Sequence, residues 1–260
     1  MAQVRAKKYL GQHFLKDQGI ARRIAESLPL QKASCVLEIG PGMGILSQYL
    51  LQNPLVQLSA VEIDTESVNF LHRNFPELNV IEGDFLKIDW NRIYPDEFYL
   101  IGNFPYNISS QIFFKALEYK DKIPSIVCML QKEVAERIAS KPNHKAYGIL
   151  SVFMQAYYSV DYLFTVQEDV FDPPPKVKSA VVRFTRNEVK HLDCNEKFFR
   201  AVVKTAFNQR RKTLRNSLKP LVGKENLIFE EEIFNKRPEQ LDVTSFVALT
   251  NLIEQFQQKM

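Results

Sequence analysis

The segment that most constrains the fold of this chain is residues 38–44, which read Glu-Ile-Gly-Pro-Gly-Met-Gly. It follows a short apolar run, residues 35–39, and precedes a stretch with helical apolar spacing, residues 45–51. We therefore predict a strand, a tight loop and a helix. Glycines in such a loop let the backbone turn sharply and approach a ligand closely, so the motif predicts a ligand site at the end of a strand.

The same alternation of apolar runs and helical patterns continues to about residue 140. Strands that alternate with helices indicate an α/β fold, in which helices cover both faces of a parallel sheet. Further strands are predicted at residues 58–63, 79–81, 98–101 and 125–130, and helices at residues 17–28, 65–75, 109–117 and 132–139.

The pattern changes after about residue 145. Residues 157–166 and 179–185 are predicted strands on either side of a proline-rich loop, residues 171–175, and they could form an antiparallel edge. From Asn195 onward only helical periodicity remains. We place a domain boundary near residue 188, between a catalytic domain, residues 1–188, and a small all-helical domain, residues 189–260.

The spacing of the glycines indicates the kind of ligand. A nicotinamide-type loop reads G-x-G-x-x-G, but here the third glycine comes one residue earlier, and no G-K-[ST] follows to cradle phosphates. The acidic residue two positions before Gly40 and this closer spacing fit a nucleoside without a pyrophosphate. Gly40 and Gly42 are candidate cofactor-binding residues.

One carboxylate lies in the end of the next strand, and a second lies just past the strand after it. Glu62 lies 22 residues after Gly40, near the offset at which a carboxylate accepts hydrogen bonds from ribose hydroxyls. Asp84 follows the third strand, where it could accept from an adenine amino group. Each alone could be an ordinary turn or cap residue, but three such positions after three successive strands favour a cofactor site.

The sequence Asn103-Phe104-Pro105-Tyr106 follows the fourth strand, so it should face the same ligand. The exocyclic amine of adenine is a poor nucleophile, because its lone pair is delocalised into the ring. The Asn103 side-chain oxygen and the Pro105 carbonyl could accept its N–H groups and localise that lone pair. Tyr106 offers a face for an extruded base and for cation–π stabilisation of the developing positive charge. The alternative is a plain turn built from asparagine and proline.

Charge is unevenly distributed in the C-terminal part. The chain has 34 lysines and arginines against 30 acidic residues, but residues 200–224 contain eight basic residues and no acidic one. Such a stripe could bind phosphates, although it could also be a solvated helix face. We expect Val203, Phe207, Arg210, Leu214 and Leu218 near one another on one helix, with Arg211 and Arg215 on an adjacent face. The candidate RNA-binding residues are Arg210, Arg211, Lys212 and Arg215.

Several classes of protein are disfavoured. The three cysteines form no C-x-x-C pair and the four histidines show no metal-ligand spacing, so we expect no metal and a reducing compartment. No apolar run approaches the roughly 20 residues needed to cross a bilayer, and the basic residues 1–16 lack the apolar region of a secretory signal. We expect a cytoplasmic protein without membrane contact.

These motifs together resemble the RNA adenine-N6,N6-dimethyltransferases, and among them the bacterial small-subunit (16S) ribosomal RNA branch. Residues 8–15, Lys-Tyr-Leu-Gly-Gln-His-Phe-Leu, are similar to that branch's opening motif; residues 171–179 are similar to its post-catalytic loop; and residues 206–216 are similar to its C-terminal helix. The resemblance implies a Rossmann-like class I methyltransferase sheet with a small helical C-terminal domain, and S-adenosyl-L-methionine as the cofactor.

The resemblance also assigns roles to residues. His13 and Leu15 match cofactor contacts, and Phe171 matches an aromatic residue that covers the second face of the target base. His13 stands where asparagine is common and Phe104 where leucine is common; both departures are mild, although Phe104 could alter the pocket floor. The implied substrate is two adjacent adenosines in a hairpin loop near the 3′ end of 16S rRNA, within a partly assembled small subunit, and the implied enzyme is a monomer.

Three alternatives stay open at this point. The first is an erythromycin-resistance-type methyltransferase acting on 23S rRNA, although the opening motif and residues 206–216 favour the small-subunit branch. The second is a ribosome-assembly factor, or a transcription factor, that keeps the cofactor fold without catalysis. The third is a DNA or small-molecule methyltransferase, but DNA enzymes usually have aspartate at the position of Asn103.

Overall fold

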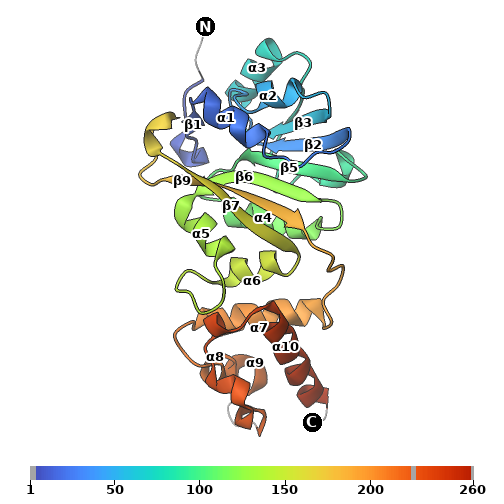
Figure 1. Cartoon of the computed structure of the whole chain (residues 1–260), viewed down its shortest axis with the longest axis vertical. Coiled ribbons are helices and arrows are strands. Elements are labelled where there is room, and N and C mark those ends of the chain that lie inside the picture. The colour runs from blue at the N-terminus through green and yellow to red at the C-terminus, as the bar shows by residue number, and fades with distance from the viewer. Residues whose placement is uncertain (1–3, 224–226, 259–260) are drawn as a thin grey trace. The chain divides into compact units, whose positions relative to one another are not determined.

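The computed structural model describes residues 4–223 and 227–258, and these form two compact units (Figure 1). The first unit contains the residues up to Ala135 together with Ser159–Arg186, and the second contains Glu136–Tyr158 and the residues from Asn187 onward. Lys224, the last residue of the basic stripe, lies outside the described residues. Within the described ranges, no helix is long and apolar enough to cross a bilayer.

A seven-stranded sheet forms the centre of the first unit, in the order β4-β3-β2-β5-β6-β9-β7. The first five strands in this order pair in parallel with their neighbours, and β9 is antiparallel to β6. The two predicted edge strands, β7 and β9, lie next to each other at the end of the sheet. The bounds are β2 (Ser34–Ile39), β3 (Val56–Glu62), β4 (Asn79–Glu82), β5 (Phe98–Asn103), β6 (Ser125–Gln131), β7 (Tyr158–Val166) and β9 (Ser179–Arg186).

The inner strands are apolar at nearly every position because both of their faces are covered. On one face, Ile24 of α1 joins a buried cluster with Val36 of β2 and Val127 of β6. On the other, the ring of Phe113 in α4 lies 5.1 Å from that of Phe184 in β9. The helices of this unit are α1 (Gln18–Ala25), α2 (Ser47–Leu51), α3 (Thr65–Asn74), α4 (Ser109–Glu118) and the first residues of α5 (Lys132–Ala139).

A second, two-stranded sheet pairs β1 (Phe14–Leu15) with β8 (Phe171–Asp172) in antiparallel orientation. Phe14 lies opposite Asp172, and Leu15 lies opposite Phe171. The sequence did not predict these strands. They pair the opening motif with the start of the proline-rich loop, two segments that lie far apart in the sequence.

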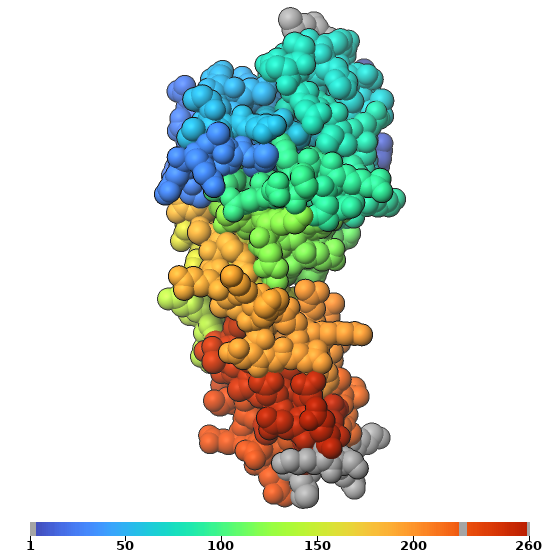
Figure 2. All heavy atoms as spheres, turned by 90° about the vertical axis from the view of Figure 1, so that its right-hand side faces the viewer, coloured from blue at the N-terminus to red at the C-terminus, as the bar shows by residue number. Residues whose placement is uncertain are grey.

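The second unit is helical, as expected, and its core is aromatic. The ring of Phe207 in α7 lies 5.9 Å from that of Phe246 in α10. Asn195 caps α7 by accepting a hydrogen bond from the Phe198 N–H at 3.1 Å. The helices are α6 (Ile149–Gln155), α7 (Glu196–Asn208), α8 (Leu214–Ser217), α9 (Lys219–Val222) and α10 (Val243–Gln258). In Figure 2 the described residues from α7 onward are coloured from orange to red.

Residues 136–158 group with the C-terminal part because α6 packs there. The ring of Phe153 in α6 lies 6.1 Å from that of Phe199 in α7, and nearly every residue of α6 is buried. The predicted boundary near residue 188 is close to the division between Arg186 and Asn187. The division into a catalytic and an RNA-binding domain remains a prediction.

The prediction of one helix through Val203 and Leu218 is wrong. Helix α7 ends at Asn208, the backbone of Gln209 leaves the helical region, and α8 begins only at Leu214. The Leu214 N–H donates to the Lys236 carbonyl at 2.8 Å instead of continuing the helix. This break still buries both Phe207 and Leu214, so the apolar spacing that suggested a helix is satisfied by two short ones.

Candidate active site

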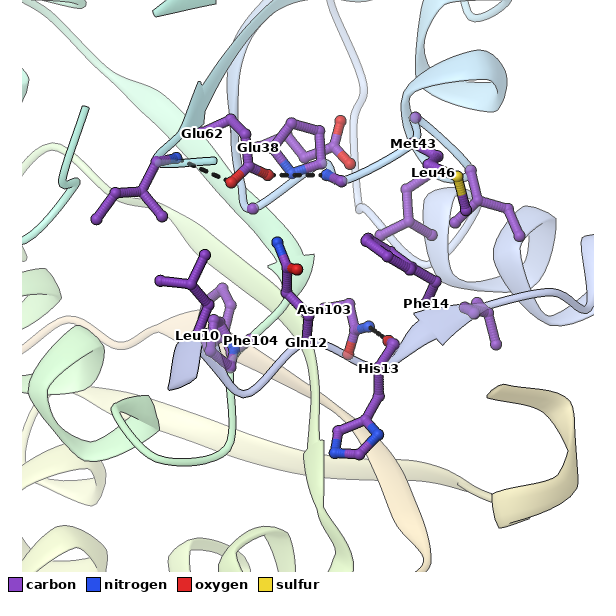
Figure 3. A pocket seen from close by; sticks show the side chains of 18 of the residues that line it. Leu10, Gln12, His13, Phe14, Glu38, Met43, Leu46, Glu62, Asn103 and Phe104 are labelled. Atoms are coloured by element: carbon purple, nitrogen blue, oxygen red, sulfur yellow. Dashed lines mark hydrogen bonds between the residues drawn. The ribbon is translucent and has the colours of Figure 1, made fainter. Parts of the chain in front are cut away.

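A cavity of about 810 Å³ opens at the carboxyl ends of β2, β3 and β5 in the first unit (Figure 3). Its volume is in the range of small-molecule sites, and the carboxyl ends of parallel strands are where such folds bind ligands. Its walls come from parts of the chain that lie far apart in the sequence. The main lining segments are residues 9–16, 40–46, 61–63, 84–86 and 103–108.

The glycine loop forms one wall of the cavity in the way that the sequence predicted. Gly40 and Gly42 have φ angles of 66° and 58°, which only glycine adopts without strain. A Cβ atom on Gly40 would meet nothing within 4 Å, whereas one on Gly42 would lie 2.9 Å from the Phe14 ring. The loop backbone therefore has free space beside it at Gly40, whereas Phe14 of the opening motif packs against it at Gly42.

Glu62 ends β3 and is almost fully buried beside the glycine loop. Its Oε2 accepts the Gly42 N–H at 3.0 Å, and its Oε1 accepts the N–H groups of Ile63 and Asp64 at 2.8 and 2.9 Å. Burial raises the pKa of this carboxyl, and the three backbone donors oppose that shift. These bonds fix the position of Glu62 at the cavity and leave one acceptor site, on Oε2, for a ligand hydroxyl.

Glu38 is a second buried carboxylate of the cavity wall. Its Oε2 accepts a hydrogen bond from the Ser47 hydroxyl at 2.6 Å, whereas its Oε1 has no partner among the described residues. Burial raises the pKa of Glu38 to about 7; the Ser47 hydrogen bond opposes the shift and the neighbouring Glu62 adds to it. A buried, unpaired acceptor in a cavity wall suits a ligand that brings a donor or a positive charge.

Asp84 lines the far end of the cavity, past β4. Its Oδ1 accepts the Leu86 N–H at 2.9 Å, and its Oδ2 lies 3.7 Å from the Lys87 ammonium. These contacts are those of a turn-forming residue, yet the side chain also borders the cavity. The position of Asp84 therefore fits both a turn-forming role and a cofactor-binding role.

Asn103 is the last residue of β5, where it pairs with Met129 of β6. Its Nδ2 donates to the His13 carbonyl at 3.1 Å, as the dashed line in Figure 3 shows. Only the amide nitrogen can donate to a carbonyl, so this bond fixes which way the side chain points. The carbonyl of Pro105 accepts the Ile108 N–H at 3.3 Å. Phe104 lies fully buried below them, against Phe113.

Tyr106 is held at two points. Its hydroxyl is hydrogen-bonded to the hydroxyl of Ser179, the first residue of β9, and its ring stacks on that of His13 with centroids 5.5 Å apart and planes at 26°. Burial raises the pKa of the Tyr106 hydroxyl, so it stays neutral at physiological pH. The sequence did not predict either contact, because each joins positions that are distant along the chain.

The cavity does not include every residue that the resemblance singled out. Leu15 lines it from β1, but Phe171 is only 1% exposed and belongs to the same buried core cluster as Leu15. The role of Phe171 in covering a base stays a prediction. His13 lines the cavity, and its carbonyl holds Asn103, whereas its ring points away from Glu62 and the glycine loop (Figure 3).

The segment before the opening motif is tied to the end of β3, which the sequence did not reveal. The Lys7 ammonium forms an ion pair with Asp64 and lies 3.3 Å from Glu66. The pairing raises the pKa of Lys7, while Asp64 has a lowered pKa because its hydrogen bonds to Lys7 and Ser67 outweigh its burial. These contacts tie the residue just before the opening motif to the residues that follow β3.

In the second unit, the four predicted RNA-binding residues differ in their surroundings. The Arg210 guanidinium lies 3.2 Å from Glu239 and donates to the carbonyls of His144 and Lys145, and Arg215 donates to the Phe229 carbonyl at 2.6 Å. The side chains of Arg211 and Lys212 are exposed and have no partner within the part of the chain that the structure describes. They lie in the turn between α7 and α8.

Residues 4–223 and 227–258 contain no cluster of metal-ligating side chains. No group of three or more histidine, cysteine, aspartate or glutamate side chains could hold an ion there. Cys35, Cys128 and Cys194 are free thiols.

The sheet order, its antiparallel strand β9 and a cavity walled by a glycine loop and an acidic strand end define a class I methyltransferase. Solved structures agree with this class. A dimethyladenosine transferase from Plasmodium falciparum superposes with a TM-score of 0.78 at 26% identity, covering 95% of this chain and 98% of that one. A structure titled 23S rRNA methyltransferase ErmE gives 0.68 at 24% identity, covering 93% and 99%, and shows the fold alone.

The family follows from sequence comparison. The family model described as ribosomal RNA adenine dimethylase matches residues 3–255, so the chain belongs to that family of methyltransferases. The protein named ribosomal RNA small subunit methyltransferase A in Parabacteroides distasonis is 59% identical to this chain, over 100% of this chain and 98% of that protein. The protein of that name in Flavobacterium johnsoniae is 58% identical over 98% of each chain.

Proposed function

We propose that this enzyme transfers methyl groups from S-adenosyl-L-methionine to the N6 atoms of two adjacent adenosines in a hairpin loop near the 3′ end of 16S rRNA. The proposal takes its substrate from the names of the relatives and from the resemblance of the opening motif. The observation that carries it is the fixed amide of Asn103 at the cavity, where an adenine amine would need an acceptor. The products would be N6,N6-dimethyladenosines.

The residues of the cavity fit the proposed cofactor. Its size suits a nucleoside with an amino-acid tail, the space at Gly40 admits a close approach, and Glu62 sits at the offset for ribose hydroxyls. The unpaired Oε1 of Glu38 suits the ligand's ammonium group. His13, Leu15, Gly42, Asp84 and Asn103 would complete the cofactor site. When bound, the cofactor supplies an electrophilic methyl group on a positively charged sulfur.

The chain's own residues would prepare the acceptor. The Asn103 oxygen and the Pro105 carbonyl accept the two N–H groups of the target amine, which localises the nitrogen lone pair toward the methyl group. The Tyr106 ring supports the base by stacking and stabilises the positive charge that develops on the amine. Phe171 would cover the second face of the base only after a rearrangement, because it is buried in this structure.

The proposed partner is a partly assembled small subunit, reached in the cytoplasm by a monomeric enzyme. Loop adenosines are already partly unstacked, so extruding them requires less free energy than extruding a paired base. Arg211 and Lys212 are free to contact phosphates, while Arg210 and Arg215 already have protein partners.

The experiment compares the wild type with Asn103→Ala on small-subunit particles isolated from cells that lack this protein. We expect the wild type to label adenosines of the 16S 3′ region, located by mass spectrometry. Asn103→Ala should lose methylation by a factor of at least about 100, in the range for a lost transition-state hydrogen bond, while still binding the particle. Transfer to 23S rRNA alone would overturn the substrate, and joint loss of binding and transfer would make Asn103 structural.

A further inference from the structure

The His13 side chain contacts the residues expected around the target base and not the cofactor half of the cavity. Its ring stacks on Tyr106 at 5.5 Å and 26°, and its Nδ1 lies 2.7 Å from the Pro173 carbonyl. In Figure 3 the imidazole points away from Glu62 and the glycine loop. We propose that His13 is a positioning residue of the base site, one that sets the orientation of Tyr106. This inference rests on the proposed function.

Three contacts of this single residue converge on the proposed catalytic segment. The His13 carbonyl accepts from Asn103 Nδ2 at 3.1 Å, the ring lies on Tyr106, and Nδ1 reaches the segment between β8 and β9. Since a carbonyl can only accept, Nδ1 carries a hydrogen and donates a hydrogen bond to the Pro173 carbonyl. His13 therefore connects the first and last residues of Asn103–Tyr106 to the chain around residue 173.

The second anchor of Tyr106 comes from the same part of the chain. Its hydroxyl is hydrogen-bonded to Ser179, which follows Pro173 and begins β9. The ring is thus held at one face by His13 and at its edge by Ser179. A stacking platform that is fixed before RNA binds loses less side-chain entropy on binding, which favours the complex.

The alternative assignment, a cofactor contact through the side chain, fits the structure less well. The main chain of His13 lies at the cavity and already holds Asn103 through its carbonyl, so a cofactor contact there needs no imidazole. Phe171, the other aromatic candidate for the base site, is buried and does not line the cavity. In this structure it is therefore His13 that accompanies Tyr106.

The test uses His13→Ala, His13→Phe, which keeps a ring, and His13→Asn, which keeps a hydrogen-bond donor. The control is His72→Ala, because His72 is exposed on α3 and does not line the cavity. The measurements are kcat and KM for small-subunit particles, the affinity for S-adenosylhomocysteine by calorimetry, and thermal unfolding to verify folding.

We expect His13→Ala to reduce kcat/KM for particles roughly three- to tenfold, the range for loss of one aromatic pair, with the affinity for S-adenosylhomocysteine within about twofold of wild type. His13→Phe should recover part of the loss, and His13→Asn less of it. The proposal is overturned if the affinity for S-adenosylhomocysteine falls by the same factor, or if His13→Ala is as active as His72→Ala.

A measurement without substrate separates this inference from the proposed function. In protein with isotope-labelled tyrosines, stacking predicts that the Tyr106 ring resonances shift in His13→Ala and stay in place in His72→Ala. Unchanged Tyr106 resonances in His13→Ala would refute the positioning role. A wild type that labels no ribosomal RNA would instead refute the proposed function, and the Tyr106 resonances would still decide the role of His13.

Discussion

At the scale of single residues, the buried carboxyl of Glu38 links the stability of the fold to pH. Its pKa in the folded protein is about 7, above the ordinary value of 4.5. The folded state therefore holds a proton more tightly than the unfolded chain, and the stability that this provides is complete below pH 4.5 and lost as the pH rises through 7. This pH dependence of stability is opposite in sign to that of a carboxylate in an ion pair, whose stabilising effect is lost as the pH falls.

We expect the free energy of unfolding of the wild type, relative to Glu38→Gln, to fall by about 3 kcal/mol between pH 4.5 and pH 7.5. Glutamine keeps the acceptor for Ser47 and cannot ionise. Urea unfolding at several pH values measures the difference, with Glu77→Gln, an exposed position on the connection to β4, as the control. Parallel curves for wild type and Glu38→Gln would contradict the prediction.

Some residues of the site could be predicted from the sequence and others could not. Gly40, Glu62 and Asn103 each lie at the carboxyl end of a strand, and parallel strands bring these ends to one edge, so their meeting in one cavity followed from the spacing. The contacts of His13 with Tyr106 and of Tyr106 with Ser179 could not be predicted. They depend on how loops pack, and no periodic pattern records loop packing.

At the scale of elements, long apolar runs were predictable and short pairings were not. The predicted strands and helices of residues 35–139 all correspond to observed ones, since burial on both faces leaves a strong apolar signal. Strands β1 and β8 have two residues each and pair with a distant partner, so neither has a signal of its own. The helix expected through Arg210 failed because the Lys236 carbonyl competes for the Leu214 N–H.

The turn between α7 and α8 gives a prediction for RNA binding. Arg211 and Lys212 are exposed, whereas Arg210 is bound to Glu239 and two carbonyls. We expect Arg211→Ala with Lys212→Ala to weaken binding to small-subunit particles and to reduce the salt dependence of binding by about two units of slope at most, without changing stability. Filter binding across a salt series measures this slope.

Arg210→Ala is the matched comparison. It should lower the stability of the protein by about 1–3 kcal/mol, because two carbonyls and Glu239 lose a donor, and it should change the salt slope little. Thermal unfolding checks the first effect. If Arg210→Ala alone lowered the salt slope while the double variant did not, the assignment of these residues would be reversed.

At the scale of the whole molecule, every residue that lines the cavity belongs to the first unit. We therefore expect cofactor binding to reduce local unfolding in the first unit more than in the second. S-adenosylhomocysteine at 100 times its dissociation constant should stabilise the folded protein by about 2.7 kcal/mol. We expect slower hydrogen exchange in residues 9–15, 40–44 and 61–63, which line the cavity, and little change in α7 and α10. NAD is the control ligand, because the glycine spacing does not fit it. Protection confined to α7 and α10 would contradict this assignment.

The pairing of Leu15 with Phe171 and of Phe14 with Asp172 also determines when the enzyme can become functional during its own synthesis. The opening motif, which lines the cavity, is translated before the sheet, but the strand that holds it is translated only after most of the sheet. A growing chain therefore has a complete ligand site only once residues 171–173 have emerged. Until then the opening motif has no strand partner, and the methyl donor has no finished site to enter.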